Sequence, residues 1–242
     1  MTTLWRGAAA CGTLALSVTL SLAQTPAGPD RAAALKQALA SNKAALRQYT
    51  WVETTDITLK GEDKKQERKQ CVYAADGTVT KTPLPGQSPS QPEEQSPSRR
   101  RGGGAVKKAI VSNKIDEMKD YMGKVKALMQ EYVPPDAERV QAVQAAGKLT
   151  MEPSSSGATL TLKDYVKPGD SMAIGLDAKG TAIQTFNVKS YVEKPKEDDV
   201  TLSVTYGLLP DGTSYPQRTV LDVAAKKIGV TVTNSDYRKV GS

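Results

Sequence analysis

The sequence contains no histidine, and only two of its 242 residues are cysteine. Without histidine, the Ser-His-Asp and Cys-His nucleophile systems are excluded, and the commonest ligand of transition metals is missing. Zinc or copper would have to bind through carboxylates and thiolate alone, which is a poor set of ligands. We therefore expect no metal site, no cofactor and no histidine-based catalysis.

Aromatic residues are also scarce, and acidic residues are outnumbered. The chain has one Phe and two Trp, and its formal net charge is +7. A basic surface favours anionic partners such as phospholipid head groups, lipopolysaccharide or acidic polymers. The simpler interpretation is that the charge serves solubility.

The N-terminus has no hydrophobic run as long as the roughly 20 residues that a membrane-spanning helix needs. The uncharged run Ala8–Leu22 is shorter and is interrupted by polar residues. Arg6 precedes this run, and Ser21-Leu22-Ala23 places small residues before Gln24. This order predicts a secretory signal peptide over residues 1–23, with an uncleaved anchor as the alternative. We therefore expect a periplasmic or secreted protein that has no nucleic-acid partner.

The two cysteines do not suggest lipidation or a disulfide. Cys11 lies before the end of the hydrophobic run, whereas a lipoprotein signal places its cysteine after the run. Cleavage would leave Cys71 as the only cysteine, so no internal disulfide could form. We expect Cys71 to be a small buried residue of a strand. Residues 24–242 are long enough to form one domain with a hydrophobic core.

The first half of this domain predicts one helix followed by a hairpin. Residues Arg31–Gln48 are rich in Ala, Leu, Lys and Gln, which favour a helix. In Tyr49–Leu59 apolar and polar side chains alternate, as in a half-buried strand. Lys64–Ala75 predicts a strand with a solvated, charged face, and Asp76-Gly77 predicts a tight turn into Thr78–Lys81.

Residues 82–104 are rich in Pro, Ser and Gly and have almost no apolar side chains. Such a segment buries too little surface to offset the entropy of ordering, so we expect a disordered insertion in the domain. Arg99, Arg100 and Arg101 lie near its end and could contact an anionic membrane surface. A plain solvated loop is the alternative.

The centre of the chain predicts a helical hairpin. Apolar residues recur every three or four positions over Ser112–Glu131, and three of them are methionines. Pro134-Pro135 would end this helix, Asp136 could cap a second one, and Gly147 would stop it. The methionine stripe could line a lipid cavity or simply pack into the core.

The last third alternates between apolar and polar residues in successive short segments separated by turns. Short connections favour an antiparallel meander, so the fold class is α+β with an antiparallel sheet. The expected strands are Ala158–Lys163, Ser171–Leu176, Thr181–Val192, Val200–Leu208, Val220–Val223 and Ile228–Val232.

The order of these elements resembles the periplasmic outer-membrane lipoprotein-carrier (lipoprotein-sorting) family. The resemblance rests on Tyr49–Leu59 after the first helix, on Leu209–Pro216, and on Ile228–Tyr237, which ends in Asn-Ser-Asp-Tyr. It implies a curved antiparallel half-barrel with an N-terminal helix and a central helical hairpin as a lid. Acyl chains would be held between the lid and the sheet.

We therefore expect a non-catalytic binding or carrier protein for an apolar or acylated ligand. The alternative is a structural or protein-interaction module of the envelope with a fully packed core. A hydrolase would need a carboxylate pair in apolar surroundings, and no pair in the sequence has them. The residues expected to line the ligand site are Trp51, Ile57, Leu59, Met118, Met122, Val125 and Met129.

Overall fold

The computed structural model describes residues 29–84 and 104–241, and describes side chains in residues 37–84 and 116–241. Within these ranges the chain forms the helices α1 (Pro29–Leu46), α2 (Gly104–Gln130) and α3 (Ala137–Ala145), and one short 3₁₀ helix, η1 (Ala224–Lys226). The strands are β1 (Tyr49–Leu59), β2 (Glu62–Tyr73), β3 (Val79–Pro83), β4 (Leu149–Ser154), β5 (Gly157–Lys163), β6 (Ser171–Asp177), β7 (Ile183–Tyr191), β8 (Asp199–Leu208), β9 (Ser214–Val223) and β10 (Ile228–Lys239).

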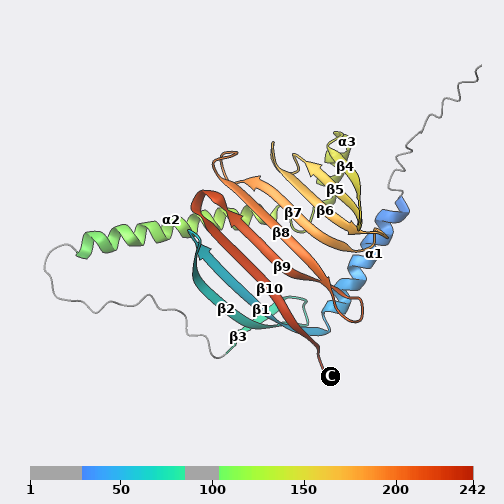
Figure 1. Ribbon diagram of the computed structural model, residues 1–242, viewed down its shortest axis with the longest axis horizontal. Helices are drawn as coiled ribbons and strands as arrows, with labels where there is room; N and C mark the ends of the chain where they lie inside the picture. Colours follow the sequence, from blue (N-terminus) through green and yellow to red (C-terminus); the bar gives the residue numbers. More distant parts are fainter. Residues whose placement is uncertain (1–28, 85–103, 242) are drawn as a thin grey trace, which may run out of the picture.

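These ten strands form one antiparallel sheet in the order β3-β2-β1-β10-β9-β8-β7-β6-β5-β4. The expected α+β class is confirmed, and so is the meander, because β4 to β10 are neighbours in chain order. The N-terminal hairpin joins the sheet at the last strand of the meander, where β1 pairs with β10. The chain therefore crosses from β3 to β4 through the helical pair α2–α3 (Figure 1).

Most elements lie where the sequence patterns predict them, but β4 was not expected, and β9 and β10 are longer than the predicted Val220–Val223 and Ile228–Val232. Strand β1 has the predicted bounds, whereas α2 begins at Gly104 rather than Ser112. Thr82 and Pro83, at the start of the expected insertion, belong to β3 and pair with Gln70 and Lys69 of β2. The predicted signal peptide lies outside the described residues, and so do residues 85–103 of the expected insertion, with its three arginines.

The predicted boundaries of α3 are confirmed. The carboxylate of Asp136 accepts a hydrogen bond of 2.8 Å from the Arg139 backbone N–H, which satisfies one of the free donors of the first turn. At the other end, Gly147 has a φ of +68°, a left-handed conformation that glycine adopts without steric cost.

One face of the sheet packs against α2, and we call it the inner face. Side chains alternate between the two faces of a strand, and residues opposite each other on neighbouring strands share a face. One row of the inner face is apolar across seven strands. It consists of Leu162, Met172, Val188, Leu202, Leu221, Val230 and Ile57.

The core lies between this inner face and the helices. One cluster of buried residues includes Leu128 of α2, Val143 of α3 and Met172 of β6. A second cluster joins Val125 of α2 to residues of β8, β9 and β10. Met129 packs against both clusters, so α2 connects the two parts of the core.

Candidate functional site

The helix α2 crosses the sheet near one end of the strands, where Figure 1 shows it passing behind several of them. Val125 of α2 is fully buried and packs with Val200 of β8, Val223 of β9 and Ile228 of β10. Three methionines of α2 lie around this contact and are only partly buried: Met118, Met122 and Met129.

Along the strands the burial of the inner face is uneven. On β8, Val200 is fully buried, Leu202 is half-buried, and Val204 is buried again, with 8% of its surface exposed. On β9, fully buried Val223 is followed by half-buried Leu221. We call the half-buried apolar residues of this part of the inner face the apolar strip: Leu160, Ile174, Leu202, Leu221, Val230, Val232 and Ile57.

The C-terminal end of α2 is held to the sheet by a buried polar cluster. The Tyr132 hydroxyl donates to the carboxylate of Asp170 and lies 2.8 Å from Ser190 Oγ. Asp170 also accepts backbone N–H groups of the loop after β5, including that of Tyr165 at 2.6 Å. Burial, followed by the hydrogen bond to Asp170, raises the pKa of Tyr132 above its ordinary value.

The structure brings together five of the seven residues expected to line the site. Leu59, Met118, Met122, Val125 and Met129 belong to one apolar cluster. Ile57 lies opposite Val230 on the inner face and so continues this cluster into the apolar strip. Trp51 lies on the same face, near the other end of β1.

Trp51 is part of a separate aromatic cluster. Its ring stacks on Tyr237 with centroids 5.7 Å apart and lies 5.2 Å from the ring of Tyr73. Its Nε1 donates a 3.1 Å hydrogen bond to Oδ1 of Asn234. With only 6% of its surface exposed, Trp51 already has its neighbours within the protein. Cys71, its partner on β2, is fully buried as expected, and burial raises the pKa of the thiol.

The inner face also carries a charged region that sequence reasoning did not include in the site. It lies on β2, where Lys69 contacts Glu67 at 2.7 Å and Lys65 contacts the same carboxylate. These two lysines, Lys65 first, lower the pKa of Glu67 to about 2. We call these three residues the lysine ladder. Their alternation with Gln66 and Arg68 was the sequence signal that they share one face.

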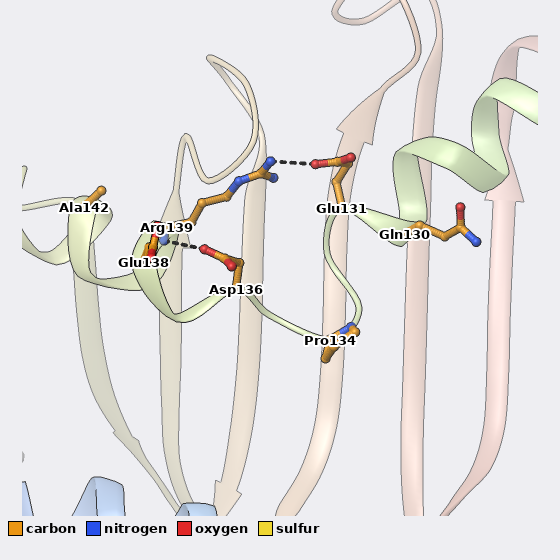
Figure 2. Close-up of a pocket in the computed structure, with 7 residues that line it drawn as sticks. All are labelled: Gln130, Glu131, Pro134, Asp136, Glu138, Arg139 and Ala142. Atoms are coloured by element: carbon orange, nitrogen blue, oxygen red, sulfur yellow. Dashed lines mark hydrogen bonds and ion pairs between the residues drawn. The ribbon is translucent and has the colours of Figure 1, made fainter. Parts of the chain in front are cut away.

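Two surface hollows are lined mainly by polar and charged residues. The larger, of about 590 Å³, lies between the end of α2 and α3. Figure 2 shows it lined by Gln130, Glu131, Pro134, Asp136, Glu138, Arg139 and Ala142, with an Arg139–Glu131 ion pair of 2.6 Å across it. The smaller, of about 280 Å³, lies among the charged residues Asp56, Asp63, Lys64 and Lys65 and the amide of Gln66. Such linings suit polar ligands, not an acyl chain.

Two further findings concern only the described part of the chain. Among the described side chains, those of residues 37–84 and 116–241, no group of three or more Cys, Asp and Glu could hold a metal ion. Within residues 29–84 and 104–241, no helix combines the length and the apolar character needed to span a membrane.

No protein-family model and no curated protein matches the chain. Two solved structures are similar to it. A DUF1329 family protein from Desulfovibrio piger is 11% identical, with 87% of this chain and 94% of that chain covered and a TM-score of 0.37. A LolA superfamily protein from Nitrosomonas europaea is 12% identical, with 86% and 94% covered and a TM-score of 0.34.

Proposed function

We propose that this protein is a non-catalytic carrier that binds an apolar or acylated ligand between α2 and the inner face of the sheet. The observation that carries the proposal is the apolar strip. Its seven residues come from six strands, share one face and remain half-buried beside a methionine-bearing helix. A contiguous apolar surface that is not fully covered marks a candidate ligand groove.

The dimensions of the strip suit a hydrocarbon chain. From Ile57 on β1 to Leu160 on β5 the strip crosses six strand spacings. At about 4.8 Å per spacing, this distance is roughly 29 Å. Each CH₂ group that leaves water for such a surface contributes about 0.8 kcal/mol. The flexible side chains of Met118, Met122 and Met129 could adapt to chains of different shape.

Binding requires α2 to shift, because Val125 packs tightly against Val200 and Val223. The anchor at Tyr132 lets α2 move about its C-terminal end without leaving the sheet. We therefore assign α2 the role of a lid. We place the protein in the periplasm or outside the cell, and Arg99, Arg100 and Arg101 remain candidates for contact with an anionic membrane.

The test is native mass spectrometry of the purified protein with 1-lauroylglycerol. We expect one ligand per chain. Leu221→Asn, in the apolar strip, and Met122→Gln, in the lid, should each weaken binding several-fold. Val220→Asn is the matched control, because Val220 is the neighbour of Leu221 on the opposite face of β9. Equal loss of binding in the control would contradict the proposed site.

The alternative function is an envelope interaction module with a packed core. The observation in its favour is that Val125, Val200 and Val223 are fully buried without any ligand. A protein that takes up no acyl ligand in this experiment would support the alternative and overturn the carrier proposal.

A further inference from the structure

The inner face of the sheet changes its chemical character at β1. From β5 to β10 its rows are mainly apolar, whereas on β2 the same face carries Lys65, Glu67 and Lys69. Residue pairing across β1 establishes this placement, because Ile57 lies opposite Lys65, and Thr55 lies opposite Glu67.

The apolar strip and the lysine ladder are therefore contiguous. Ile57 has Val230 of the strip on one side and Lys65 of the ladder on the other. Directly opposite residues on neighbouring strands have Cβ atoms about 5 Å apart. A single molecule lying across β1 would contact hydrocarbon side chains at one end and ammonium groups at the other.

The ladder is accessible to such a molecule. The side chains of Lys65, Glu67 and Lys69 are 47%, 31% and 32% exposed. Ion pairs this exposed contribute little to stability, so the ladder has only a small structural value. Glu67 pairs with both lysines and occupies the position that an external anion would take. Glu53, which lies opposite Lys69 on β1, forms its ion pair with Lys81.

We propose that Lys65 and Lys69 bind the anionic head group of an amphiphile whose acyl chain lies on the apolar strip, with the head group replacing Glu67. The proposal rests on the proposed function and adds the class of ligand: a lipid with a phosphate or carboxylate group rather than a neutral one. Charge-assisted hydrogen bonds from the two ammonium groups provide the selectivity.

The test compares three probes by isothermal titration calorimetry: 1-lauroyl-lysophosphatidylglycerol, 1-lauroylglycerol and inorganic phosphate. The first two share the acyl chain and differ in the phosphate. We expect the lysophospholipid to bind about tenfold more tightly than the neutral lipid, and this preference to decrease as salt is added. Inorganic phosphate alone should bind far more weakly than either.

Two pairs of substitutions locate the effect. Lys65→Gln with Lys69→Gln should abolish the preference. The control variant, Arg68→Gln with Lys189→Gln, removes two positive charges from exposed positions on the opposite face. This control should keep the preference for the lysophospholipid. Glu67→Gln removes the internal competitor and should increase affinity for the lysophospholipid several-fold, which a purely structural role of Glu67 would not do. This last variant decides the matter if the lysine variant fails to fold.

The failures of the two proposals are distinguishable. The head-group site would be wrong if the two lipids bound with equal affinity. It would also be wrong if the double lysine variant kept the preference for the lysophospholipid. Either result would leave the carrier function intact. Tight binding of inorganic phosphate would mean that the lysine ladder binds a free anion. The proposal that its ligand is an amphiphile would then be wrong. If neither lipid binds, the carrier function fails, and the inference fails with it.

Discussion

The hydroxyl of Tyr132, just after α2, donates a hydrogen bond to the carboxylate of Asp170, which lies 38 residues later in the chain. Both residues are buried, and Asp170 also accepts the backbone N–H groups of Tyr165, Val166 and Lys167. One carboxylate thus orders the loop after β5 and holds the end of α2 to that loop. The proposed lid has a fixed end at this point.

Tyr132→Phe should lower the free energy of unfolding by about 1–3 kcal/mol, because a buried carboxylate loses one of its donors. Urea denaturation measures this change. Tyr191→Phe is the control, since its hydroxyl bonds the exposed carbonyl of Pro168, and it should cost less than about 0.5 kcal/mol. Equal effects of the two substitutions would show that Tyr132 is not a special anchor.

Stability should decrease at alkaline pH. Burial raises the pKa of Tyr132 and Tyr237 above the ordinary value of about 10. A group whose pKa is higher in the folded state contributes its full stabilisation at pH values below its pKa in the unfolded chain. This contribution is lost as the pH rises above that pKa. We expect the free energy of unfolding to fall above about pH 10, with tyrosinate absorbance appearing together with unfolding. Full ionisation of all tyrosines in a folded protein would contradict this.

Gly123→Ala should stabilise the protein by about 0.5–1 kcal/mol. Gly123 lies inside α2, and an added Cβ would meet no atom within 4 Å. Alanine loses less conformational entropy than glycine when a helix forms. Thermal unfolding checks the gain, and a decrease in stability would mean that this part of α2 is not helical in solution.

Trp51→Phe should lower stability and leave acyl binding unchanged. The substitution removes the donor to Asn234 Oδ1 and leaves that buried oxygen unpaired, at a cost of about 1–3 kcal/mol. A double-mutant cycle with Asn234→Ala isolates the hydrogen bond from the loss of ring packing. Weaker ligand binding by a folded Trp51→Phe variant would extend the ligand site to the aromatic cluster.

The ion pairs of Glu67 should be visible in an acid titration. Lys65 and Lys69 hold the pKa of Glu67 at about 2, below the ordinary value of a glutamate. Because the folded pKa is lowered, the associated stability is present above about pH 4.5 and is lost as the pH falls toward about 2. NMR titration of the Glu67 carboxyl measures this directly. In the Lys65→Gln, Lys69→Gln variant the pKa should return toward its ordinary value.

Local patterns predicted most of the separate elements, but neither β4 nor the full lengths of β9 and β10. The alternation in Tyr49–Leu59 predicted both the bounds of β1 and the face that Leu59 shares with Ile57. The spacing of Met118, Met122, Val125 and Met129 predicted the side of α2 that packs against the sheet. These patterns depend on the 2.0- and 3.6-residue periods of strand and helix, which neighbouring residues determine by themselves.

The assembly of the candidate site could not be predicted in the same way. In the sequence, nothing distinguishes Asp170 from other loop carboxylates. In the folded protein it is buried beside Ser190 of β7 and Tyr132 at the end of α2. The contact between Ile57 and Val230 joins residues far apart in the chain, and it depends on β1 pairing with β10.

The sequence by itself therefore determined the excluded chemistries, the α+β class and the faces of the individual elements, because composition and short periods depend on nearby residues alone. Only the tertiary structure decided that the apolar strip and the lysine ladder adjoin on one face. Strand neighbours are selected by burial across the whole sheet, and no local pattern contains that information.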